Sequence, residues 1–512
     1  MSTCASIDMQ RLPTANPDFT AIQMLNKIYV DKSDLIYQIA SSSIPIFFSR
    51  PRRFGKTLLL NTLSSLFMHG LQYFHGLMID NMWHDKTYKI VHIDFSRMAR
   101  KNSFDLNYTL STKIIKEFGE NNDLVQSNSY KLQYPDIILD EILKNTSNNS
   151  IVLLIDEYDA PLTNNINEPA ELKDILNVLS NFYATVKQYT AKFRHIFITG
   201  VTRTCHNEIF SSLNNFLDLS LDATFNKILG FTKSELVRYF DPYVENAAHI
   251  LEITKNDLYD RLEQYYDGFQ FALNANETVY NPWSILNFLT LSHNGLQNYW
   301  FDSGGTPTII MQYLKIEKDC DFLDYNKRNL SIEMHKLSHK YEINDIPRDI
   351  LLYQTGYFSL RNKDDGYAHL VISNLEIEES LLLLYLEKNH LETSTMLNTK
   401  MKDLVSYIDS KNLSKIIAIF NTILNECVSI LSKIFDDERS LRDIIYAALI
   451  KVPKLQKIKE SETVKGSADL ELITKKTCMI IEFKRISKNL GPKLALTQAI
   501  KQIKESLRRT FF

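Results

Sequence analysis

Four short runs of nearly continuous apolar residues recur in the first 200 positions, separated by longer stretches with helical spacing. The runs are IPIFFS (44–49), YKIVHIDFS (88–96), IVLLIDE (151–157) and HIFITG (195–200). Apolar runs of this length, joined by long connections, are typical of parallel strands buried on both faces. We therefore predict an α/β fold with a parallel sheet. Ligands of such sheets bind beyond the carboxyl ends of the strands, so the polar residues that follow each run are candidates for a site.

The first run leads directly into the loop SRPRRFGKT (49–57), and a leucine-rich segment with helical spacing follows. Strand, loop and helix in this order form the setting of phosphate-binding loops, whose backbone N–H groups face phosphate oxygens. In that interpretation Lys56 contacts the β- and γ-phosphates, Thr57 ligates Mg²⁺ and Gly55 allows close backbone approach. The loop departs from the usual Walker A pattern, because Arg50 stands where that pattern has glycine. The alternative interpretation is a basic surface loop ahead of an amphipathic helix.

A second motif favours the phosphate site. The run IVLLIDEYD (151–159) has the form of a Walker B strand, in which Asp156 holds Mg²⁺ and Glu157 polarises the attacking water. The two motifs stand in the expected order, about 100 residues apart, with one strand between them. The run after them places Thr202 and Arg203 where an ATPase has a γ-phosphate sensor.

Five segments together resemble the AAA-ATPase-like family, which is similar to archaeal and STAND-type ATPases: YVDKSDLI (29–36), RPRRFGKTLLLNTL (50–63), LLIDEYDAPL (153–162), ITGVTR (198–203) and LNNFLDLSLD (213–222). The arginine-rich loop is the usual form of Walker A in that family. The resemblance therefore implies that Arg50 and Arg53 belong to the nucleotide site, with Arg50 supplying charge to phosphate or to a partner. It also implies a P-loop NTPase sheet of the ASCE type over residues 1–230, with strand order 5-1-4-3-2, and ATP and Mg²⁺ as ligands.

Residues 231–365 have the pattern of a mostly helical segment with aromatic packing, interrupted by turn signals such as Tyr266-Asp-Gly268 and Asn281-Pro282. They resemble the lid and winged-helix-like region that follows the ATPase core in the same family. His335 and His339 are four residues apart and could pair on a metal. No third ligand is in view, so exposed helix histidines are the favoured interpretation.

The segment KGSADLELITKKTCMIIEFKRI (465–486) contains two β-rich runs joined near residues 474–477. A hairpin folded there sets Asp469 roughly opposite Glu482, within reach of one divalent cation. Strand periodicity puts Lys484 on the same face as Glu482. Two carboxylates and a lysine on one sheet surface can orient water and position it on a phosphate. The alternative is an exposed hairpin face of mixed charge.

This constellation resembles the PD-(D/E)xK nuclease superfamily, which implies a small α/β restriction-endonuclease-like domain over residues 366–512. By the resemblance, Asp469 and Glu482 are metal ligands, Lys484 is the catalytic lysine, and Gln502 matches a glutamine on the following helix. Asp443 stands where the family usually has glutamate. The chain also stops directly after the helix of Gln502, where the family adds a strand, so the nuclease core is expected to be truncated.

Composition and net charge limit the classes of binding partner that the protein can have. The net charge is −3, so nucleic-acid binding requires a local basic patch. From residue 484 onward the chain has such a patch, with only Glu505 against it: Lys484, Arg485, Lys488, Lys493, Lys501, Lys504, Arg508 and Arg509. The five cysteines lack CxxC spacing and no apolar run approaches the ~18 residues of a membrane span, so we expect a soluble, cytoplasmic protein without a membrane partner. The oligomeric state stays open.

Two functions follow from the sequence. The first is an ATPase fused to a metal-dependent nuclease that acts on DNA or RNA. The second is an ATP-dependent switch whose nuclease-like fold is inactive and only binds nucleic acid or a protein partner. The intact Asp469, Glu482 and Lys484 favour the first, and the short C-terminus favours the second.

Overall fold

The computed structural model describes residues 10–14, 17–98, 102–118, 134–203, 216–302, 309–311, 330–339, 341–364, 366–388, 401, 403–434, 442, 445–446, 448–449, 452, 455–463, 466–474, 476–484 and 491–507. Contacts divide the chain into two compact units. One comprises residues 1–316 and 329–377, and the other comprises residues 317–328 and 378–512. The domain boundaries expected at residues 230 and 365 stay predictions.

Five parallel strands form the central sheet of the first unit, in the order β2-β3-β4-β1-β5. They are β1 (Ile46–Ser49), β2 (Lys89–Asp94), β3 (Ile151–Asp156), β4 (Phe193–Gly200) and β5 (Leu217–Asp218). Every residue of β1 and β3 is buried, which explains the near-continuous apolar runs. Counted from the other edge, the order is 5-1-4-3-2, so the expected parallel α/β sheet is confirmed. The two residues of β5 are too few to give a pattern in the sequence.

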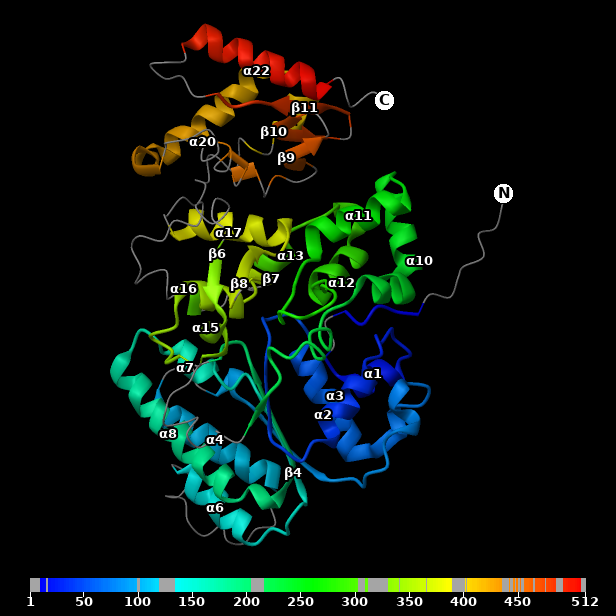
Figure 1. The fold of residues 1–512 in the computed structure, drawn as a ribbon, viewed down its shortest axis with the longest axis vertical. Helices are drawn as coiled ribbons and strands as arrows, with labels where there is room; N and C mark the ends of the chain where they lie inside the picture. Colours follow the sequence, from blue (N-terminus) through cyan, green and yellow to red (C-terminus); the bar gives the residue numbers. More distant parts are fainter. Residues whose placement is uncertain are drawn as a thin grey trace, which may run out of the picture. The chain divides into compact units, whose positions relative to one another are not determined.

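Helices pack around this sheet (Figure 1). Helix α3 contacts β2 and β3, α4 contacts β2, and α4, α6 and α8 pack on one another. The helices are α1 (Phe19–Met24), α2 (Ser33–Ser41), α3 (Lys56–His69), α4 (Ser103–Phe118), α6 (Pro135–Lys144), α7 (Ala160–Asn164) and α8 (Pro169–Gln188). Short 3₁₀ turns cover Gly70–Tyr73, Met78–Asn81, Phe95–Arg97 and Thr190–Lys192.

A group of helices follows the sheet in the same unit: α10 (Lys233–Leu251), α11 (Lys255–Tyr266), α12 (Pro282–Thr290) and α13 (Tyr299–Asp302), with a 3₁₀ turn at Ser292–Asn294. Side chains of Thr232, Thr254 and Asn281 accept hydrogen bonds from the first turns of α10, α11 and α12, which fixes where these helices begin. Their inward faces share one apolar core that includes Leu236, Leu262 and Phe288.

The first unit also contains a three-stranded antiparallel sheet, in the order β6-β8-β7. Its strands are β6 (Leu330–Glu333), β7 (Phe358–Asp364) and β8 (Tyr367–Ile372), with α15 (Met334–Ser338) and α16 (Arg348–Gln354) between β6 and β7. The prediction of mostly helix up to residue 365 is therefore corrected for the last part of that segment. The winged-helix-like interpretation stays a prediction. His335 and His339 are both exposed, as expected.

The second unit combines helices with an antiparallel sheet, in the order β11-β10-β9. Helix α22 packs against β10. The elements are α17 (Leu375–Lys388, which begins in the first unit), α19 (Leu404–Asp409), α20 (Leu413–Ile434), β9 (Gln456–Thr463), β10 (Gly466–Ile473), β11 (Cys478–Ile481) and α22 (Pro492–Leu507). The restriction-endonuclease-like interpretation stays a prediction. In the described part of the chain, none of the helices combines the length and the apolar character that a membrane span needs.

The loop between β1 and α3 is packed against residues far along the chain. The Phe54 ring meets the rings of Phe269, Phe271 and Trp300 edge-on, at centroid distances of 4.9, 5.1 and 6.3 Å. A Cβ built on Gly356 would lie 2.8 Å from Cβ of Pro51 and 2.9 Å from the Trp300 ring. The loop is therefore held by the later part of the first unit as well as by its own strand and helix.

This packing predicts a specific intolerance at Gly356. Its φ of +91° already disfavours a side chain, and Gly366 has nearly the same φ, +92°, with nothing within 4 Å of a built Cβ. We expect Gly366→Ala to cost about 1–2 kcal/mol of unfolding free energy from the left-handed backbone alone. Gly356→Ala adds overpacking against Pro51 and Trp300, for a total of about 2–5 kcal/mol. Urea unfolding of both variants measures the difference, and equal losses would show that the close approach at Gly356 is unimportant.

Candidate functional site

The loop of residues 50–55 turns the chain from β1 into α3 with two left-handed backbone positions. Gly55, directly before α3, has a φ of +100°, which glycine adopts without steric cost. Arg53 has a φ of +67°, which is uncommon for a residue with a side chain. Strand, loop and helix therefore follow one another as predicted, and α3 begins at Lys56.

The Lys56 side chain is hydrogen-bonded to the backbone of the loop that precedes it. Its side chain is buried, and its Nζ donates to the backbone carbonyls of Arg50 and Pro51 at 3.1 Å each. The same Nζ lies 3.6 Å from Oε1 of Glu157. The structure thus joins the lysine of the first motif to the glutamate of the second.

Thr57 and Asp156 connect the two motifs directly. Oγ1 of Thr57 donates to Oδ2 of Asp156 at 2.8 Å, across a separation of 99 residues. Asp156 is the last residue of β3 and is almost fully buried. Burial, reinforced by the neighbouring Glu157, raises the pKa of Asp156 to about 7, although Lys56 and Thr57 act in the opposite direction. A carboxyl group in this state is poised to ionise when a cation arrives.

Glu157 stands at the rim of the same site in a constrained conformation. Its φ of +50° is left-handed, and its side chain is 22% exposed. Backbone strain of this kind costs of order 1–3 kcal/mol and persists only where the surrounding structure enforces it. Here the enforcement comes from Tyr158, whose N–H donates to the Thr199 carbonyl and whose hydroxyl donates to the Thr202 carbonyl.

Thr202 and Arg203 follow the end of β4, and both side chains are engaged with internal partners. The Thr202 hydroxyl and N–H both donate to Oδ2 of the buried Asp159, at 2.6 and 2.7 Å. The Arg203 guanidinium pairs with Oδ2 of Asp218 at 2.7 Å and donates to the Leu337 carbonyl. Neither residue lines the pocket described below, because internal hydrogen bonds hold both side chains inside the protein.

The expectation that Arg50 supplies charge to a phosphate is wrong for its side chain. The guanidinium is 2% exposed and donates to the carbonyls of Ser49, Ser220 and Phe225. It lies between the rings of Phe48 and Phe271, 4.3 and 4.5 Å from their centroids. Burial lowers the pKa of Arg50 to about 10, well above neutrality, so its charge is retained inside the fold.

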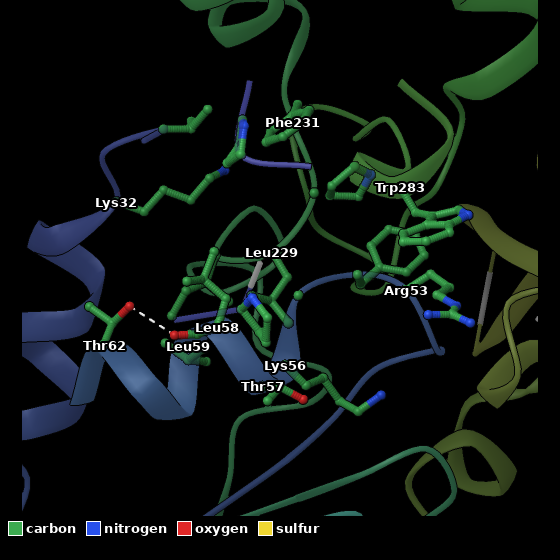
Figure 2. Close-up of a pocket in the computed structure, with 18 of the residues that line it drawn as sticks. Lys32, Arg53, Lys56, Thr57, Leu58, Leu59, Thr62, Leu229, Phe231 and Trp283 are labelled. Carbon is green, nitrogen blue, oxygen red and sulfur yellow. Dashed lines mark hydrogen bonds between the residues drawn. The ribbon is translucent and has the colours of Figure 1, made fainter. Parts of the chain in front are cut away.

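A pocket of about 480 Å³ opens beside these residues and is lined by Arg53, Gly55, Lys56, Thr57 and Glu157. Figure 2 shows Lys56 and Thr57 on one side of it and Lys32 and Phe231 on the other, with Leu229 between them. The Arg53 guanidinium lies 4.5 Å from the ring centroid of Trp283, which also lines the pocket.

Sequence reasoning missed this second side of the pocket. Its lining comes from the N-terminal segment (Ile28, Val30, Lys32), from residues 228–231 and from the start of α12. YVDKSDLI (29–36) stood out in the sequence, but no chemical role could be given to Lys32. Only the folded chain brings these segments to the loop.

A family model matches the region of the chain that contains this site. Residues 13–210 match the family model described as a predicted AAA-ATPase. The matched region contains the 50–55 loop and the N-terminal wall of the pocket. It also contains Lys56 and Thr57 of the first motif and Asp156 and Glu157 of the second. The chain is also 26% identical over 367 residues to a protein of Azotobacter chroococcum mcd 1, described as an uncharacterized protein in the vnfD 5' region. That alignment covers 70% of this chain and 67% of the relative.

A second cluster lies in the other unit, outside the AAA-ATPase-like region. β10 and β11 form the expected hairpin, with Leu470 opposite Ile481, so Asp469 and Glu482 are the next pair along the register. Oδ2 of Asp469 accepts a hydrogen bond from the Phe483 N–H at 2.8 Å. Both carboxylate oxygens of Glu482 are buried and accept no hydrogen bond in the described structure.

Lys484 interacts electrostatically with Glu482, the second acid of this pair. Burial and the neighbouring Asp469 raise the pKa of Glu482 to about 7, and Lys484 acts in the opposite direction. The structure therefore brings together Asp469, Glu482 and Lys484. Gln502 lies on α22, but its side chain is outside the described residues, as is Asp443. The described residues contain no group of three or more His, Cys, Asp or Glu side chains with metal-binding geometry.

The raised pKa of Asp156 predicts that replacing this acid by a neutral side chain increases folding stability, and that the increase depends on pH. An acid whose pKa is raised in the folded state stabilises the protein at low pH, and that stability is lost as pH rises through the folded pKa. We expect Asp156→Asn to match the wild type near pH 4 and to exceed it increasingly up to pH 8 without Mg²⁺ or nucleotide. The pKa of Asp156 rises from 3.8 to about 7, and this difference limits the gain in unfolding free energy of Asp156→Asn to about 4 kcal/mol.

Asp218 supplies a control of opposite sign. Burial acts to raise the pKa of Asp218, but the ion pair with Arg203 and the hydrogen bonds from Ser220 together outweigh it and leave the pKa below its ordinary value. Asp218→Asn should therefore lose stability at pH 8 rather than gain it. Denaturant unfolding at pH 4, 6 and 8 measures both variants. A loss of stability at pH 8 in Asp156→Asn would contradict the raised pKa.

Proposed function

We propose that this protein binds ATP with Mg²⁺ in the pocket beside the 50–55 loop and hydrolyses it. The observation that supports this most directly is the hydrogen bond between Thr57 and Asp156, which joins the two motifs at the carboxyl end of the sheet. The match of residues 13–210 to a predicted AAA-ATPase supports it independently.

The oxygens at Thr57 and Asp156 fit a magnesium ion. A hydroxyl and a carboxylate 2.8 Å apart are the hard oxygen donors that Mg²⁺ prefers. A cation there would offset the burial that raises the pKa of Asp156. When bound, Mg²⁺ neutralises charge on the phosphate oxygens.

Lys56 and Glu157 have separate roles, the first in binding the phosphates and the second in activating the attacking water. Lys56 exchanges the carbonyls of Arg50 and Pro51 for β- and γ-phosphate oxygens when the nucleotide binds. Glu157 is partly exposed in the pocket, where its carboxylate accepts a proton from the attacking water. Arg53 lines the same pocket and contributes positive charge near the phosphates.

We also propose that Asp469 and Glu482 hold a divalent cation with which the C-terminal unit hydrolyses phosphodiester bonds in DNA or RNA. The buried oxygens of Glu482 beside the Asp469 carboxylate support this, because burial and a neighbouring acid both disfavour the charged form and a cation would stabilise it. Lys484 then positions the phosphate or the water. Exposed Lys493 and Lys501 on α22 supply contacts to the nucleic-acid backbone. The competing proposal is an ATP-dependent switch whose C-terminal unit binds without cleaving.

Two substitutions separate ATP binding from hydrolysis. Lys56→Ala removes a charged contact to the phosphates and should weaken ATP binding by about 2–3 kcal/mol. Glu157→Gln keeps the size of the side chain and should bind ATP normally but hydrolyse it about 10²–10⁴-fold more slowly. Calorimetry and phosphate release measure the two effects, with Lys86→Ala on the exposed surface as the control. Unchanged ATP affinity in Lys56→Ala would rule out this site.

The C-terminal proposal is tested by cleavage of plasmid and single-stranded nucleic acid with Mg²⁺ or Mn²⁺, with and without ATP. Asp469→Ala should abolish cleavage by losing the cation. Lys484→Ala should abolish cleavage while Mn²⁺ binding survives, since lysine is not a ligand. Lys493→Ala is the control and should weaken binding only slightly and mainly at low salt. An inactive wild type across all substrates would favour the switch.

A further inference from the structure

The pocket beside the 50–55 loop has two chemically different sides. The side near Lys56 carries Arg52, Arg53, Thr57 and Glu157, which suit a charged triphosphate. The other side is built from aliphatic and aromatic side chains such as Ile28, Val30, Ile228, Leu229 and Phe231. Apolar walls of this kind suit a flat heterocyclic base, which needs a few placed polar groups to fix its orientation.

Lys32 is the charged residue that lines this apolar side. It directly precedes α2 and is 8% exposed. Its Nζ donates to the Lys227 carbonyl and to Oε2 of Glu235, the latter at 2.9 Å. A lysine ammonium has three N–H donors, so these two contacts leave one more to give. Figure 2 shows the Lys32 side chain on the same side of the pocket as Phe231, across from Lys56 and Thr57.

The position of the ammonium is fixed by the fold. Glu235 is held in the capping box of α10, where its Oε2 accepts from the Thr232 N–H at 2.8 Å and its N–H donates to Thr232 Oγ1 at 3.2 Å. Burial lowers the pKa of Lys32, and Glu235 opposes this. A buried donor held by a helix cap needs little reorganisation when a ligand arrives, which favours selective hydrogen bonding.

We propose that Lys32 donates a hydrogen bond to a ring nitrogen of the purine base and is a specificity-determining residue of the nucleotide site. The inference rests on the proposed function, since it places the triphosphate at Lys56 and Thr57. The purine ring nitrogens N1, N3 and N7 of adenine are acceptors without a proton, and the ammonium has only donors. A base contact that involves one of these nitrogens is lost when that nitrogen is replaced by carbon.

The test compares binding of ATP with binding of 1-deaza-, 3-deaza- and 7-deaza-ATP by calorimetry. Wild-type protein should bind one of the three analogues about 10- to 100-fold more weakly than ATP, as expected for a hydrogen bond from a charged donor. Lys32→Met should bind ATP about as weakly as that analogue and should no longer distinguish the two. A merely structural role of Lys32 would lower affinity for ATP and for all analogues together and keep the discrimination.

Lys227→Met is the matched control. It removes an exposed ammonium, 49% accessible and paired with Glu277, while the Lys227 carbonyl that accepts from Lys32 is kept. It should bind and discriminate as the wild type does. Wild-type protein that binds ATP and all three analogues equally would overturn this inference alone, even if Lys32→Met does not fold. Wild-type protein that binds no ATP would overturn the proposed function and this inference together.

Discussion

The buried guanidinium of Arg50 is the constraint on which the site depends. It gathers the carbonyls of Ser49, Ser220 and Phe225 around one planar cation and places that cation between two aromatic rings. Hydrogen bonds from a charged donor to backbone carbonyls are about twice as strong as neutral ones, and stacking on rings adds to them. A glycine at this position could make none of these contacts. The loop is therefore shaped by side-chain anchoring at Arg50 and Phe54, with glycine kept only at Gly55, whose φ of +100° is larger than the +67° that Arg53 adopts.

The same anchoring links the site to the later part of the first unit. Phe271, Trp300 and Gly356 hold the loop, while Leu229, Phe231 and Trp283 form the far wall of the pocket. A ligand in this pocket would touch segments that are more than 200 residues apart. The loop is in direct contact with α12, since the Arg53 guanidinium lies over the Trp283 ring.

Acidic side chains are concentrated at the end of β3 in spite of their cost. Asp156 and Asp159 are both buried, burial raises the pKa of each, and Glu157 adds to both effects. Asp159 recovers part of that cost by accepting hydrogen bonds from Val201 and Thr202, so its role is to fix the end of β4. Among the described residues, Asp156 accepts hydrogen bonds from the Thr57 hydroxyl and the Glu157 N–H alone. In the second unit Glu482 shows a similar imbalance, with buried oxygens that accept no hydrogen bond in the described structure. Both carboxyl groups are placed where a cation would stabilise the charged form.

The sequence by itself determined the four main strands, the strand–loop–helix order at residues 46–69 and the hairpin that pairs Asp469 with Glu482. These features are local, because apolar runs, turn residues and strand periodicity act between near neighbours in the chain. The antiparallel sheet of β6, β7 and β8 and the two-residue β5 were decided by tertiary pairing, since the apolar–polar alternation in β6 and at the start of β7 lasts only four residues and β5 is too short to show one. Tertiary structure also decided the direction of side chains. A basic residue beside a phosphate-binding motif has the same appearance in sequence whether it faces a ligand or the core, and only the packing of Phe48, Phe271 and Asp218 turned Arg50 and Arg203 inward while Lys32 was brought to the pocket.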